Sequence, residues 1–162
     1  MRTLLGAALA AALAAPAAAQ QRQGDLHANY TRGTATHSTS RGAGANFQLT
    51  WGGQRAPVTM GTAAGVDYLK ESGGPSQWNL AYDGTVQVGH ADLTPYAGGS
   101  ASANWSTGRG AQWSGARLGL EGIGGLQVKL SGALAVKAEE RFGYVRGEEH
   151  ALTTRVGVAT NF

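Results

Sequence analysis

The chain has 162 residues, 26 of them glycine, no cysteine and a formal net charge of +3. The absence of cysteine excludes disulfides and thiolate metal sites, and we expect neither a metal nor another cofactor. The positive residues are scattered along the chain, so the charge does not indicate a nucleic-acid partner. Glycine opposes helix formation, and this composition favours strands.

Residues 1–19 have the pattern of a secretory signal peptide. Met1-Arg2-Thr3 gives a positive start, residues 4–15 form an apolar run, and small residues lead to Ala19. We expect cleavage after Ala19, export through the Sec pathway and one domain over residues 20–162. The alternative is a membrane anchor, but the apolar run is short for a bilayer core of about 30 Å.

Segments of the remaining chain alternate between apolar and polar residues with a period of two, as strands do. The clearest alternation places Phe47 and Leu49 on one side and Gln48 and Thr50 on the other. Gly, Pro, Ser and charged residues occupy most of the connections between segments. The predicted strands are 24–35, 42–52, 58–70, 77–89, 94–105, 113–130, 133–145 and 151–162.

The last of these segments carries Val156, Val158 and Phe162 on one side and Arg155 on the other. It resembles the C-terminal strand of bacterial outer-membrane β-barrels. The terminal aromatic residue is similar to the signal that the barrel-assembly machinery reads, so the resemblance gives Val156, Val158 and Phe162 that role.

Two internal segments carry a further resemblance. Residues 93–99 (LTPYAGG) and 134–142 (LAVKAEERF) resemble strand segments of small OmpA-like and opacity-type outer-membrane barrels of the porin family. The resemblance implies a monomeric barrel in the outer membrane of a Gram-negative bacterium, in contact with lipid and lipopolysaccharide. Glu140 stands where the family usually has Tyr. It either faces lipid near the outer rim or is turned inward by a bulge.

The sequence therefore predicts an all-β fold, an eight-stranded antiparallel up-and-down transmembrane barrel. Closure is expected because unpaired backbone groups are costly in lipid. The connections 52–57, 90–93 and 131–132 would lie in the periplasm with the termini, and 36–41, 71–76, 106–112 and 146–150 outside. A soluble periplasmic calyx that binds a ligand is the alternative. Aromatic residues are predicted at the two membrane interfaces: Trp51, Tyr96 and Phe162 on the periplasmic side, and Tyr68, Trp78, Trp105, Trp113 and Tyr144 on the other.

The alternation also predicts charged residues inside the barrel. Unpaired buried charges are unfavourable, so we expect an ion-pair network that plugs the lumen. A narrow pore for small solutes is the alternative. The inward residues are Asp67, Asp83, Arg117, Glu121, Lys129, Lys137, Glu139, Arg141 and Arg155, with Arg117, Glu121, Lys137, Glu139, Arg141 and Arg155 as the core of the network.

The expected role is structural, or one of surface interaction, without enzyme activity. Small outer-membrane barrels that modify lipid A make enzyme activity a further alternative. It requires a nucleophile and a base within hydrogen-bond reach. We expect the four histidines, His27, His37, His90 and His150, to be solvated loop residues instead.

Overall fold

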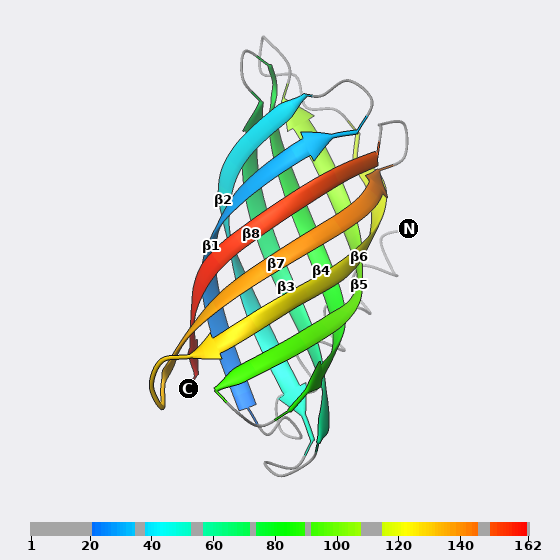
Figure 1. The fold of residues 1–162 in the computed structure, drawn as a ribbon. Coiled ribbons are helices and arrows are strands. Elements are labelled where there is room, and N and C mark those ends of the chain that lie inside the picture. Colours follow the sequence, from blue (N-terminus) through cyan, green and yellow to red (C-terminus); the bar gives the residue numbers. More distant parts are fainter. Residues whose placement is uncertain are drawn as a thin grey trace.

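The described residues of the computed structural model, 21–34, 38–52, 57–71, 74–89, 92–107, 115–145 and 150–161, form a closed barrel of eight antiparallel strands (Figure 1). Each strand pairs with its neighbours in the sequence, and β1 also pairs with β8, which closes the sheet. The predicted fold class is confirmed. The strands are β1 (Gln21–Gly33), β2 (Thr39–Trp51), β3 (Val58–Glu71), β4 (Ser76–Val88), β5 (Leu93–Thr107), β6 (Arg117–Lys129), β7 (Leu134–Val145) and β8 (His150–Asn161).

The barrel has two different ends. At the terminal end, the start of β1 lies beside the end of β8, where Gln23 pairs with Asn161. The β6–β7 turn is also at this end, and it is tight because the backbone N–H groups of Leu130 and Ser131 both donate to the oxygen of Leu134, at 2.9 and 3.1 Å. At the opposite end, the loop end, β1, β3, β5 and β7 end and β2, β4, β6 and β8 begin (Figure 1). Among the described residues, no helix has the length and hydropathy needed to span a membrane.

Several strands extend further than their sequence pattern predicts. Thr39–Arg41, predicted as loop, belongs to β2, where Ser40 pairs with Thr31 on β1 and Glu71 on β3. At the same end, Thr107 of β5 pairs with Ser76 of β4. Strand pairing uses backbone groups, so it continues past the point where apolar alternation stops. In contrast, β6 begins at Arg117 and not at 113.

The outer face of the barrel is apolar and the inner face is polar. On β1, Leu26 is 71% exposed on the outside, while Asp25 and His27 are buried on the inside. This pattern reverses that of a soluble globular protein and suits a barrel surrounded by hydrocarbon. Large exposed apolar residues on the outer face include Phe47, Met60, Val66, Leu80, Tyr82, Val86, Leu118, Leu120, Leu126, Phe142, Leu152, Val156 and Val158.

Glu140 is an exception on the outer face. The pairing of β7 with β8 is uninterrupted from Glu139 to Arg141, so no bulge turns Glu140 inward. Its side chain is exposed and accepts a hydrogen bond of 2.8 Å from the hydroxyl of Thr154. Glu140 lies in the middle of β7, so its predicted position near the outer rim is wrong.

Candidate functional site in the barrel lumen

One group of charged side chains surrounds Arg141, which is 1% exposed and projects from β7 into the lumen. Two of its nitrogens donate to the two carboxylate oxygens of Asp83 on β4. Its Nη1 also lies 3.3 Å from Glu121 Oε2, and its Nε donates to Glu139. The hydroxyl of Tyr96 on β5 donates to the second oxygen of Glu139 at 3.0 Å. We name these five residues the Arg141 cluster.

A second group surrounds Asp67 on β3. One carboxylate oxygen of Asp67 accepts a hydrogen bond from Asn29 Nδ2 at 2.8 Å and lies 2.7 Å from His27 Nε2. The other oxygen accepts a hydrogen bond from Arg155 on β8. Further contacts of His27 and Lys137 extend the group to β2 and β7. The Asp67 cluster consists of Asp25, His27, Asn29, Gln48, Asp67, Lys137 and Arg155.

The two clusters are joined into one network. Arg155 Nη1 lies 3.5 Å from Glu139 Oε1, which is also bound by Arg141. Lys137 Nζ contacts Asp25 Oδ2 at 3.1 Å and Gln48 Oε1 at 3.2 Å. As a result, each of the eight strands contributes at least one side chain to a hydrogen-bonded layer across the lumen.

His27 lies in a space that two glycines leave open. Its strand partners are Gly44 on β2 and Gly157 on β8. A Cβ atom on Gly44 would come within 2.0 Å of Asp67 Oδ1 and 2.6 Å of His27 Nε2. The missing side chain therefore allows His27 on β1 to reach Asp67 on β3 across the intervening strand.

The charges of the network are unequal in number. Asp25, Asp67, Asp83, Glu121 and Glu139 supply carboxylates, whereas Lys137, Arg141 and Arg155 supply permanent positive charges. His27 has a carboxylate oxygen at 2.8 Å from Nδ1 and another at 2.7 Å from Nε2. An imidazole can donate from both nitrogens only when it carries two protons, so the geometry suits a positively charged His27.

Five of the six predicted network residues form contacts that join strands: Glu121, Lys137, Glu139, Arg141 and Arg155. Arg117 is half-buried at the first position of β6, at the loop end. Lys129 does not belong to the interior, contrary to the prediction. It is the last residue of β6 and is exposed at the terminal end, where the barrel wall stops.

Sequence reasoning missed part of the network on β1. Asp25, His27 and Asn29 share one side of this strand, and all are buried in the lumen. The assignment of His27 to a solvated loop is wrong, because His27 is 7% exposed and contacts two carboxylates. The alternation with Leu26 and Ala28 was a signal for this orientation. His37 and His90 lie outside the described residues, and His150 is exposed at the start of β8, its ring 5.7 Å from that of Phe142.

Most of the predicted interface aromatics that the structure describes lie near one end of the barrel or the other, whereas one of them faces the lumen. Tyr68, Trp78 and Trp105 form a row across β3, β4 and β5 near the loop end, because Trp78 is the strand partner of both other residues. The ring centroids of Tyr68 and Trp78 are 5.1 Å apart. Tyr144, at the same end, is exposed, and Trp51 is half-buried near the terminal end. Trp113 lies outside the described residues.

Tyr96 is not an interface residue, contrary to its predicted role. It is 7% exposed and lies inside the barrel with its hydroxyl bound to Glu139. Its strand position has the same orientation as Ser100 and Ser102, which are also buried. Lys137 Nζ lies 5.5 Å from the centre of its ring, so Tyr96 contacts the network through both its ring and its hydroxyl.

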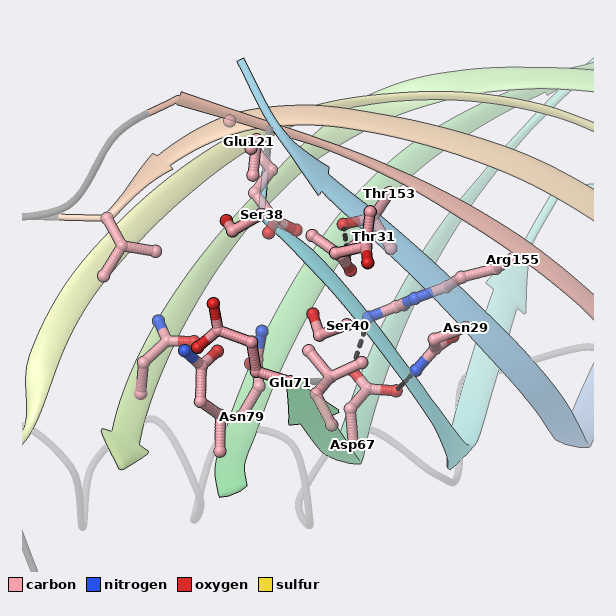
Figure 2. A pocket seen from close by; sticks show the side chains of 18 residues that line it. Asn29, Thr31, Ser38, Ser40, Asp67, Glu71, Asn79, Glu121, Thr153 and Arg155 are labelled. Atoms are coloured by element: carbon pink, nitrogen blue, oxygen red, sulfur yellow. Dashed lines mark hydrogen bonds and ion pairs between the residues drawn. The ribbon is translucent and has the colours of Figure 1, made fainter. Parts of the chain in front are cut away.

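The lumen widens toward the loop end into a cavity of about 320 Å³, which we name the vestibule (Figure 2). Its lining includes Asn29, Asp67 and Arg155 of the Asp67 cluster, together with Glu121. Glu71, at the end of β3, adds another carboxylate. The other lining side chains are mainly hydroxyl and amide groups, among them Thr31, Ser38, Ser40, Gln77, Asn79, Asn104 and Thr153.

The residues of the proposed assembly signal are described only in part. Val156 and Val158 are 53% and 48% exposed on the outer face of β8, where they can contact lipid or another protein. Phe162 lies outside the described residues, as do residues 1–19 of the predicted signal peptide.

The fold defines a class, the closed eight-stranded antiparallel barrels, and outer-membrane proteins of known structure have this fold. Neisserial surface protein A has a TM-score of 0.68 at 14% identity, over 87% of this chain and 97% of that one. The N-terminal β-barrel domain of Pseudomonas aeruginosa OprF has a TM-score of 0.58 at 14% identity, over 88% of this chain and 100% of that one. The outer membrane enzyme PagL has a TM-score of 0.50 at 12% identity, over 83% of this chain and 97% of that one. These similarities establish the fold.

No protein-family model matches the sequence, and no curated protein matches it either.

Proposed function

We propose that this protein is a structural component of the outer membrane, with a lumen plugged by ion pairs and a loop end available for surface contacts. The observation that carries the proposal is the network formed by the Arg141 and Asp67 clusters, to which every strand contributes. Mixed charges that pair across a narrow lumen fill it with side chains and leave little room for a conducting column of water.

The packing beside the network supports a closed lumen. Among the side chains of the two clusters, Gln48, Asp83, Tyr96, Lys137 and Glu139 line a cavity of about 10 Å³. A volume of this size is close to the minimum that holds one water molecule. At this point of the lumen, the side chains of the network leave room for no more than about one water molecule.

The location follows from the outer surface. An apolar outer face, with Tyr68, Trp78 and Trp105 in a row near one end, suits contact with lipid chains and headgroups. Similarity to outer-membrane barrels supports the same location. The proposal therefore includes outer-membrane lipid, lipopolysaccharide and the barrel-assembly machinery as partners of a monomeric protein of the porin family type.

Conductance in planar lipid bilayers tests the plug. The refolded wild-type protein should give no steady ion current. The double substitution Asp83→Gly with Arg141→Gly should give one, because it removes side chains from opposite walls. Glu140→Ala, which removes a carboxylate from the outer face, should remain closed. A steady current through the wild-type protein would overturn the proposal and favour the narrow pore.

The proposal also holds that the protein has no enzyme activity. Both ring nitrogens of His27 are occupied by carboxylates, so this histidine has no free position to take a proton from a nucleophile. Mass spectra of lipid A from cells with and without the gene should be the same. A change in acylation that depends on the gene would contradict this part of the proposal.

A further inference from the structure

We infer that the vestibule binds a short alkyl diammonium compound. The first observation is its charge. Asp67, Glu71 and Glu121 contribute carboxylates to the lining, and Arg155 contributes a guanidinium. Arg155 contacts Asp67 and Glu139, and Arg141 contacts Glu121, so the remaining negative charge of the lining is that of Glu71. Within the described part of the chain, Glu71 takes part in no ion pair or side-chain hydrogen bond.

The second observation concerns two buried amide oxygens. Asn29 and Asn79 line the vestibule and are 5% and 7% exposed (Figure 2). Across the described strands and loops, no hydrogen-bond donor reaches Oδ1 of either residue, and Nε and Nη1 of Arg155 have no hydrogen-bond acceptor. Buried acceptors without a donor are costly. A ligand with several N–H groups would satisfy these oxygens as well as the carboxylates.

The positions of the carboxylates indicate two cationic groups. Glu71 lies at the end of β3 and Glu121 in β6, on walls separated by two other strands. Figure 2 shows the two side chains apart in the vestibule. One ammonium group can reach one of them, whereas a molecule with an ammonium group at each end can pair with both.

The lining also accommodates an alkyl chain. Leu69 on β3 and Val145 on β7 add apolar surface to an otherwise polar cavity. A volume of about 320 Å³ is within the range of small-molecule sites and corresponds to roughly ten water molecules. These features favour a methylene chain with charged ends over a fully hydrated metal ion.

Binding can be measured by NMR on the full barrel refolded in detergent micelles, with the side-chain amide signals of Asn29 and Asn79 as probes. The ligand is 1,4-diaminobutane, and 1,4-butanediol is its uncharged counterpart. The diamine should cause saturable shifts and the diol should not. Glu71→Gln should weaken diamine binding about tenfold. Glu140→Gln removes the same charge from the outer face and should leave binding unchanged.

Two results with the ligands would overturn the inference: no saturable shift with the diamine, or equal binding of the diol. Equal effects of Glu71→Gln and Glu140→Gln would overturn it as well, as would the same shifts with magnesium chloride at equal ionic strength. The folded state of each variant is checked by its mobility in unheated and boiled gel samples. Conductance is measured without diamine, so failure of the plug and failure of the binding site are separate outcomes.

Discussion

Arg141 on β7 binds both carboxylate oxygens of Asp83 on β4, across the lumen from one wall to another. Because β4 and β7 are not neighbours, this contact links parts of the sheet that backbone pairing does not. Two parallel N–H bonds to one carboxylate also fix the orientation of the guanidinium. Buried pairs contribute little relative to apolar packing, but the removal of one partner is costly. The tests below therefore remove single partners.

Glu139→Ala should lower the free energy of unfolding by about 3 kcal/mol. Glu139 receives hydrogen bonds from Arg141 and Tyr96, so its loss leaves buried donors without an acceptor. Urea unfolding followed by tryptophan fluorescence measures the change. Glu140→Ala is the matched control from the next position, since its side chain faces outward. An unchanged urea midpoint for Glu139→Ala would contradict the ion network.

Arg141→Met should destabilise the barrel more than Asp83→Ala. Arg141 is the guanidinium at the centre of three carboxylates, so its removal leaves Asp83, Glu121 and Glu139 to repel each other. Removal of Asp83 leaves Arg141 with two partners. We expect losses of about 4 and 2 kcal/mol, measured by the same urea titration. Equal losses, or the reverse order, would show that repulsion among the three carboxylates around Arg141 does not determine the loss of stability.

Gly44→Ala should cost about 2 kcal/mol, because the new methyl group would displace His27 or Asp67 and break their contact. Gly124→Ala is the control, since a Cβ atom there has no neighbour within 4 Å. Its effect should stay within about 0.5 kcal/mol. Thermal unfolding in the same detergent compares the two variants. Similar melting temperatures for the two variants would show that the contact between His27 and Asp67 does not depend on the missing side chain at Gly44.

Tyr96→Phe should cost about 1.5 kcal/mol, because Glu139 loses a buried donor while the aromatic ring is kept. Tyr82→Phe provides the comparison, as its side chain is exposed on the outer face. Urea midpoints distinguish the two. If Tyr82→Phe were the more harmful change, the inward position of Tyr96 would be in doubt.

The period-two pattern was sufficient for the strand number and for most orientations, because each strand separates a hydrocarbon-facing side from a polar side. The predicted interface role of Tyr96 is wrong because a position near a strand end does not determine the face: Tyr96 alternates with outward residues such as Ala97 and therefore faces the lumen. The contact of His27 with Asp67 could not be derived from the pattern. It depends on the tilt and stagger of the strands and on the absence of a side chain at Gly44, which alternation does not specify.

The seam between β1 and β8 is where the two ends of the sheet meet. Side chains on both sides of this seam reach past their nearest neighbours: Asp25 to Lys137 on β7, His27 to Asp67 on β3, and Arg155 also to Asp67. Separation of β1 from β8 therefore requires the loss of lumen contacts together with the backbone ladder. The barrel should consequently open as one cooperative unit, and not by stepwise peeling of a terminal strand.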